Sequence, residues 1–234
     1  MKIGIITAMS LEHEQIVSLL TEKKHYQYGP FSFTQGIIKG GTNTLILMQC
    51  GIGKVNSATG CVELIRYFNP DCIISTGVAG GIDRCLNVMD VVVANSVVYH
   101  DVWCGEGNEY GQVQGLPTRF TTNKTLYDCA INLSQEQTTI YGGLICSGDK
   151  FITDQEELIA IKNSFPEGLA VDMESCSIAQ VCHLYQKPFI SFRIISDTPG
   201  ADKHWEQYTN FWEDMADRSF AITHHFLLSL PQQL

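Results

Sequence analysis

The chain has 234 residues, a formal net charge of −10, 44% hydrophobic residues and 17% charged residues. This length suits one domain with a sizeable core, and the composition is that of a globular protein rather than a disordered one. An acidic chain with five arginines and no basic run is a poor partner for nucleic acid, and no apolar run approaches the roughly 20 residues of a membrane span.

The cysteines and the N-terminus indicate a cellular compartment. There are nine cysteines, an odd number, and no two of them form a C-x-x-C pair, which disfavours a disulfide framework. The first residues lead directly into an apolar strand, so we expect no signal peptide. We therefore expect a reduced, cytoplasmic protein.

Strand and helix signals alternate along the chain. In chain order we expect a strand at 2–7, a helix at 10–21 capped by Ser10, a hairpin of strands at 32–38 and 44–50, a helix at 54–68, and a strand at 72–76 that ends in a glycine turn at 77–81. There follow a β-rich stretch at 90–99, an irregular segment at 100–120, a helix at 122–134, a strand at 142–147, a helix at 154–163, a strand ending at Val171, a helix at 174–185, a strand at 188–195 and an amphipathic helix from Asn210 to Leu230.

This βα alternation, with one antiparallel element, predicts an α/β fold. We expect three layers, with a mixed and largely parallel sheet between helices. No linker, repeat or low-complexity tract interrupts the pattern, so a single domain over 1–234 is predicted.

Three acidic residues stand where an apolar strand gives way to polar sequence: Glu12, Glu174 and Asp197. In an α/β sheet, ligands bind at the carboxyl ends of the strands. Three acids from distant parts of the chain therefore indicate a site that handles protons, and their negative charge disfavours phosphate. Simpler interpretations exist, because an acid at a helix start is stabilised by the helix dipole and Ser196-Asp197 lies among residues typical of turns.

Arg193 lies within a strand that is otherwise almost wholly apolar. Such a charge is costly to bury unless it is paired, so a carboxylate is expected beside it, and Glu12 and Asp197 are the candidates. Met173, between two acids at a strand end, offers an apolar face where a ligand could rest. The histidines lack the spacing of a metal site, and none is expected.

Two glycine-rich turns place bare backbone N–H groups at strand ends, where a small ligand could approach closely. They are Gly51-Ile52-Gly53 and the run 77–81. Neither matches a P-loop or the G-x-G-x-x-G pattern of dinucleotide binding.

These segments fall in a recognisable order from the first residue to about residue 200. They are MKIGII with Ala8-Met9 and Glu12, GIGKV at 51–55, TGVAGG at 76–81, YHD at 99–101, EYGQ at 109–112, SGDKFI at 147–152, Met173-Glu174 and RIISD at 193–197. Together they resemble the 5'-methylthioadenosine/S-adenosylhomocysteine nucleosidases, within the nucleoside phosphorylase superfamily.

The resemblance implies a hydrolase that cleaves the N-glycosidic bond of 5'-alkylthio adenosines without a cofactor. It implies that Asp197 protonates the departing adenine, that Glu174 with Met173 binds the ribose, and that Glu12 takes a proton from the attacking water. It places adenine against Phe151 and Ile152. It also implies that Arg193 is catalytic and that further substrate contacts come from Met9, Ile52, Val78, Ala79, Gly80, Asp172 and Ser196.

The loop after the first strand helps to distinguish a hydrolase from a phosphorylase. Phosphorylases of the superfamily place arginine there to hold phosphate, whereas this chain has no arginine before Arg66 and carries Glu12 in that loop. Hydrolysis is therefore favoured over a purine nucleoside phosphorylase.

Two departures from the family pattern leave the 5' substituent open. Val78 stands where the family's nucleosidases often have serine, and residues 102–108 diverge in a region that the family uses for its dimer interface and for the neighbour's 5' pocket. The resemblance implies a homodimer. A futalosine hydrolase is an alternative, and a non-catalytic nucleoside-binding protein is a remoter one, because all three acids are present.

Overall fold

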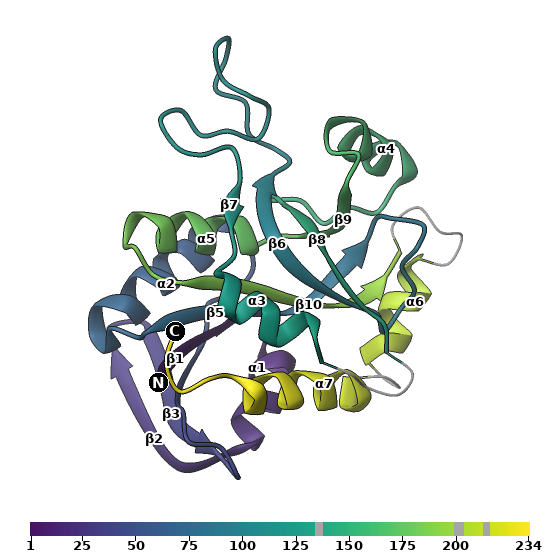
Figure 1. The fold of residues 1–234 in the computed structure, drawn as a ribbon. Helices are drawn as coiled ribbons and strands as arrows, with labels where there is room; N and C mark the ends of the chain where they lie inside the picture. Colours follow the sequence, from purple (N-terminus) through teal and green to yellow (C-terminus); the bar gives the residue numbers. More distant parts are fainter. Residues whose placement is uncertain (134–137, 199–203, 213–215) are drawn as a thin grey trace.

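The computed structural model describes residues 1–133, 138–198, 204–212 and 216–234 (Figure 1). The strands are β1 (Lys2–Thr7), β2 (Leu20–Tyr28), β3 (Phe31–Ile38), β4 (Thr44–Gln49), β5 (Cys72–Gly81), β6 (Val91–Tyr99), β7 (Phe120–Thr121), β8 (Ile140–Ser147), β9 (Gly168–Asp172) and β10 (Phe189–Asp197). The helices are α1 (Ser10–Ser18), α2 (Lys54–Phe68), α3 (Lys124–Ile131), α4 (Gln155–Ser164), α5 (Ser175–Leu184), α6 (His204–Asn210) and α7 (Ala216–Ser229).

The sheet is built from two parallel sets of strands that run in opposite directions. One set is β4, β1, β5 and β10, and the other is β6, β8 and β9. Antiparallel pairing of β10 with β6 and of β5 with β9 joins the two sets, so five strands close on themselves. The α/β class with a mixed sheet is confirmed, with more antiparallel pairing than the one element expected from the sequence.

Helices cover both faces of the sheet because successive strand residues point to opposite faces. On one face, Ile73 of β5 packs in a cluster with Leu64 of α2 and Ile178 of α5. On the other face, Ile74 belongs to a second cluster with Phe226 of α7, and α1 and α3 add to it. Within the part of the chain that is described, no helix has the length and apolarity needed to cross a membrane.

The N-terminal elements differ from expectation in two ways. Helix α1 ends at Ser18, and the following residues form the edge strand β2, which pairs with β3 through its backbone. Most β2 side chains are exposed, so the strand lacks the apolar alternation that sequence reading depends on. The N-cap is Met9 rather than Ser10, because the Glu12 side chain accepts the Met9 N–H.

The glycine run at 77–81 is not a turn after the strand. It continues β5, and Gly80 pairs with Asp197 on one side and Val171 on the other. Glycine is required at Gly77, whose φ is +151°, because a Cβ there would lie 2.4 Å from Glu12 Oε1. The tract therefore lets two strands and a carboxylate approach the same stretch of backbone.

The C-terminal helix expected from Asn210 to Leu230 corresponds to α7, and a separate helix, α6, precedes it. Helix α6 was not expected, and α7 ends near the expected end, while residues 213–215 of the expected helix lie outside the described residues. The exposed polar face of α6 hides its period from sequence reading, since Trp205, Glu206, Thr209 and Asn210 are all exposed.

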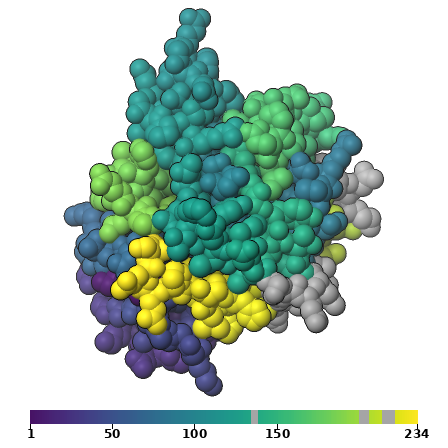
Figure 2. Space-filling view, in the orientation of Figure 1, coloured from purple at the N-terminus to yellow at the C-terminus, as the bar shows by residue number. Residues whose placement is uncertain are grey.

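The segment between β6 and β7 is irregular, as expected. Its loops project beyond the helices and strands at the top of Figure 1, and Figure 2 shows the same residues as a protrusion from the body. Trp103 on this segment is 57% exposed.

Candidate active site

A pocket of about 610 Å³, including its open mouth, lies where β1, β5, β9 and β10 end. This size falls in the range that holds a small organic ligand, about 300–1,000 Å³. Its wall includes every site residue expected from the sequence: Met9, Glu12, Ile52, Val78, Ala79, Gly80, Phe151, Ile152, Asp172, Met173, Glu174, Arg193, Ser196 and Asp197.

Glu12 points from the first turn of α1 toward the middle of β5. Its Oε2 accepts the N–H groups of Ala8 at 3.1 Å and Met9 at 3.0 Å, and its Oε1 accepts that of Val78 at 3.0 Å. Burial raises the pKa of Glu12, while the charge of Arg193 and these three N–H groups act in the opposite direction. The carboxylate is thus held rigidly, with at most one lone pair free on Oε1.

Arg193 is 2% exposed and is paired with Asp172, not with the two carboxylates suggested by the sequence. Its Nε lies 2.9 Å from Asp172 Oδ2. The hydroxyls of Ser75, Ser175 and Ser191 accept further N–H bonds from the guanidinium, at 2.6 to 3.3 Å. Asp172 was expected only as a substrate contact, so this pairing was missed.

Glu174 lies beyond β9 and precedes α5, and it is 6% exposed. The N–H of Gly53, at the start of α2, donates to its Oε1 at 2.9 Å. Burial, with added repulsion from Asp172, raises the pKa of Glu174 to about 7, although Arg193 and the Gly53 N–H favour its anion. The carboxyl therefore titrates close to neutral pH.

Asp197 ends β10 and is 2% exposed. The Ser196 hydroxyl donates to its Oδ1 at 2.5 Å. Register with Gly80 places Asp197 beside β5, two residues along from the N–H that holds Glu12. Three carboxylates from a stretch of the chain that runs from residue 12 to residue 197 are thus gathered around one short segment of β5.

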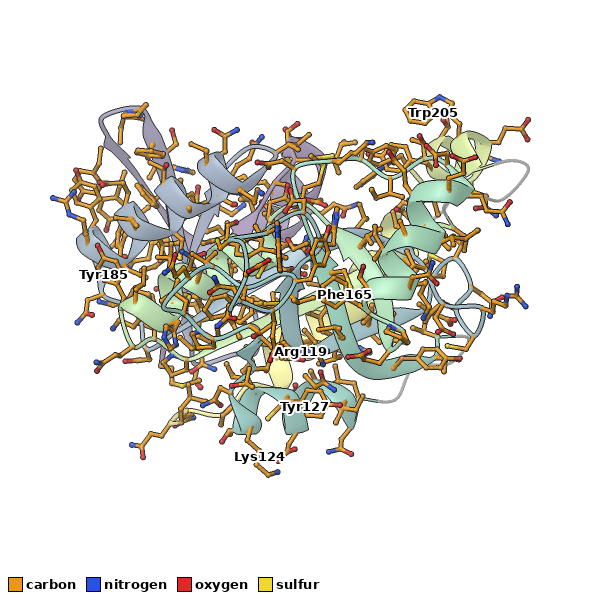
Figure 3. The ribbon with its side chains drawn as sticks, turned by 90° about the horizontal axis from the view of Figure 1, so that it is seen from above. Arg119, Lys124, Tyr127, Phe165, Tyr185 and Trp205 are labelled. Atoms are coloured by element: carbon orange, nitrogen blue, oxygen red, sulfur yellow. The ribbon has the colours of Figure 1, made fainter. Side chains whose placement is uncertain are left out.

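Aromatic side chains form the outer wall of the pocket. Tyr208 of α6 lines it, with its hydroxyl 3.7 Å from Met9 Sδ and its ring 5.5 Å from that of Phe151. Trp205, which is 63% exposed, contacts both of these rings and stands at the outer end of α6 in Figure 3. Tyr208 was not expected from the sequence because α6 was not expected; a tyrosine four residues before a tryptophan carries no signal by itself.

The charged groups that line the pocket are suited to proton transfer and not to binding an anion. Of the lining cations, Arg193 is paired with Asp172, and Lys150, also missed by the sequence analysis, forms an ion pair with Glu157. Neither is left to balance an anion beside three carboxylates. Among the described residues there is no cluster of three or more His, Cys, Asp or Glu side chains that could hold a metal ion.

The chain is similar over almost its whole length to known proteins of one superfamily. The family model described as "Phosphorylase superfamily" matches residues 2–228. A Desulfotalea psychrophila protein called 5'-methylthioadenosine/S-adenosylhomocysteine nucleosidase is 37% identical over 234 residues, which is 99% of each chain.

Solved structures are similar over the same length. A Colwellia psychrerythraea nucleosidase of that name, in complex with adenine, has a TM-score of 0.93 and 34% identity, with 100% of this chain and 97% of that one covered. The native structure of a Helicobacter pylori futalosine hydrolase has a TM-score of 0.87 and 28% identity, with 97% of each chain covered.

We expect Asp172→Asn to lower the free energy of unfolding by about 3–5 kcal/mol, because it leaves the buried Arg193 charge without its anion. The matched control is Asp128→Asn, which removes an exposed partner of Lys124 and should cost less than about 0.5 kcal/mol. Urea unfolding at pH 7.5 measures both. Equal, small losses would contradict the importance of the buried pair.

We also expect Glu174→Gln to stabilise the fold in a pH-dependent way. The folded pKa is raised, so wild type loses stability as pH rises from the unfolded value near 4.5 to about 7, and the variant does not. Its advantage should therefore be absent at pH 4, grow to roughly 2–3 kcal/mol, and stay level above pH 7.5. Urea unfolding across this range, with surface Glu14→Gln as control, would show an advantage independent of pH if the account were wrong.

Proposed function

The chain belongs to the phosphorylase superfamily, and we propose that within it the protein hydrolyses 5'-methylthioadenosine and S-adenosylhomocysteine, releasing adenine and the 5-thioribose product. The observation that carries this proposal is the gathering of Glu12, Glu174 and Asp197 on one pocket whose cations are already paired. We take residues 1–234 as one catalytic domain.

Departure of adenine requires an acid. Adenine is a poor leaving group as an anion, so a ring nitrogen must gain a proton as the glycosidic bond breaks. Asp197 takes this role, because it is buried at the end of β10 and a hydroxyl bond from Ser196 fixes its orientation. Phe151 and Ile152 offer the purine an apolar wall.

The ribose carries positive charge while the bond breaks. Glu174 places negative charge beside that oxocarbenium-like sugar and accepts hydrogen bonds from its hydroxyl groups, with Met173 packed against the ring. The Gly53 N–H keeps the carboxylate pointed into the pocket. Because the pKa of Glu174 is raised to about 7, kcat/KM should fall as pH drops through neutrality.

Water attacks the opposite face of the sugar. One water O–H bond breaks, the oxygen lone pair forms the bond to the anomeric carbon, and Glu12 Oε1 takes the proton. The arrangement follows the logic of an inverting glycosidase, in which an acid and a base act from opposite sides of the sugar. The positive charge of Arg193 favours the anionic forms of the base, Glu12, and of the ribose-binding carboxylate, Glu174.

The same pocket is unsuited to phosphorolysis. Phosphate would bring negative charge beside the Glu12 carboxylate, and the guanidinium that could offset it is already bound to Asp172. Futalosine hydrolysis would use the same acid and base, but the Helicobacter pylori futalosine hydrolase is 28% identical to this chain, against 34% for the Colwellia psychrerythraea nucleosidase.

We extend the proposal to a cytoplasmic homodimer. All nine cysteines are free, as in a reducing compartment, which cell fractionation would check. Trp103 and Tyr110 on the projecting segment are 57% and 44% exposed, and Ile52 and Val55 at the start of α2 are 53% and 75% exposed. Lys54 binds Asp101 at 2.8 Å, so the start of α2 lies beside the start of the projecting segment, and Ile52 lines the pocket.

Sedimentation tests the dimer. The wild-type chain of 26.1 kDa should sediment as a dimer, and Trp103→Asp should weaken association at least about tenfold by burying a charge. The control Leu228→Asp lies on α7, on the other face of the sheet, and should leave the dimer intact. A wild-type monomer at micromolar concentration would contradict the proposal.

The acid assignment is tested by Asp197→Asn. We expect kcat for methylthioadenosine to fall by at least about 100-fold, because the amide cannot supply the proton. Adenine binding, measured by calorimetry, should remain within a few-fold of wild type. Asp71→Asn, at the opposite end of β5, serves as control. Near-normal turnover by Asp197→Asn would overturn the assignment.

A further inference from the structure

Glu12 borders two separate spaces. One is the nucleoside pocket; the other is a smaller cavity of about 320 Å³, including its opening, which we call the rear cavity. Within the described residues the two share only Glu12 and Val78. The rear cavity is lined by Glu12, Gln15, Ile16, Thr76, Gly77, Val78, Ile194, Trp212 and Thr223.

The rear cavity lies on the side of the sheet covered by α1 and α7. Strand alternation turns Thr76 and Val78 of β5 toward that face, together with Ile74 of the second core cluster. Gln15 and Trp212 are half-buried and stand at its solvent side, whereas Thr76 and Thr223 are buried deeper. The cavity thus runs from the surface inward to a catalytic carboxyl.

Its polar groups are suited to water. Thr76 and Thr223 are each 3% exposed, and both line the rear cavity. Their buried hydroxyls can hydrogen-bond an ordered water where the space admits one. Together with the Glu12 carboxyl and the Gln15 amide they supply the two to four partners that an ordered water needs.

The proposed reaction requires a route by which Glu12 can lose a proton after each turnover. If Glu12 is the base of the proposed hydrolysis, on which this inference rests, it gains one proton from water in each turnover and must lose it before the next. Its carboxyl is 7% exposed, and a bound nucleoside covers its front. Burial raises the pKa of Glu12 and so favours the protonated form, while its three N–H bonds favour the anion.

We propose that the rear cavity is a water site through which Glu12 passes its proton to solvent while the nucleoside pocket is occupied. The O–H bond of the protonated carboxyl breaks, the proton moves to water held by Thr76 and Thr223, and hydronium leaves past Gln15. Thr76 and Thr223 are positioning residues, since they act through water and do not touch the nucleoside.

Val78 separates the two spaces. Its backbone N–H fixes Glu12 Oε1, and its apolar side chain lines both cavities without offering a hydrogen bond. Water therefore has no side-chain partner at this position, and the polar groups behind it must organise the exchange.

The test is the double variant Thr76→Val with Thr223→Val, which keeps the shape of the cavity and removes its hydroxyls. The first turnover of methylthioadenosine, measured by rapid quench, should remain within about twofold of wild type, because the base starts as the anion. Steady-state kcat should fall about tenfold, with a larger solvent deuterium isotope effect, because proton release becomes limiting. A small buffer such as formate should restore part of the loss.

The control is Thr122→Val, which removes a buried hydroxyl that lines neither cavity. It should leave both rates unchanged. If the double variant fails to fold, Gln15→Leu at the half-buried mouth replaces it with the same readouts. An unchanged steady state, or equal loss in first and later turnovers, overturns the water route.

These outcomes are distinct from failure of the proposed function. Turnover by the unmodified chain reports on nucleoside hydrolysis, whereas the ratio of first to later turnovers in the variant reports on the rear cavity alone. A crystal structure with adenine adds a readout that does not depend on rate. It should contain a water within hydrogen-bond distance of Thr76 Oγ1 and of Glu12, and a dry rear cavity would contradict the proposal.

Discussion

Arg193 lies fully inside the protein, bound to Asp172 at 2.9 Å and surrounded by three serine hydroxyls. A guanidinium cannot lose its charge there, so the fold must supply anions around it. Asp172 does so by direct contact, and the same positive charge opposes the effect of burial on the pKa values of Glu12 and Glu174. The positive charge of Arg193 thus favours the anions of both carboxyls, which burial in an apolar pocket disfavours.

Strand pairing brings these groups together from distant parts of the chain. The β5 segment from Gly77 to Gly80 holds Glu12 through the Val78 N–H, pairs with Asp197, and pairs with the strand that leads into Asp172 and Glu174. Side chains larger than hydrogen would not fit at Gly77, where the backbone passes between Glu12 and Arg193. The closure of five strands on themselves follows from the same two pairings. One short backbone stretch thus sets both the topology of the sheet and the geometry of the site.

Much of this could be predicted from the sequence, because the acids follow apolar strands and the strands alternate with helices of clear period. The helix at 54–68 was predicted with its observed bounds, and all fourteen expected site residues line the pocket. Features that depend on backbone pairing or on tertiary contacts could not be predicted from the sequence. The exposed strand β2 carries no apolar alternation, α6 with Tyr208 has a mostly exposed face, and the partner of Arg193 depends on how β9 lies beside β5. The roles assigned to the lining residues rest on the resemblance and on the chemistry of the pocket.

The central claim is that water, not phosphate, attacks the nucleoside beside Glu12. The most direct measurement is analysis of the products formed from methylthioadenosine with and without inorganic phosphate. The account predicts free adenine and free methylthioribose, formed at a rate that phosphate does not change. A requirement for phosphate, with a sugar 1-phosphate as product, would contradict it and would mean that the Glu12 carboxylate tolerates an anion at its side.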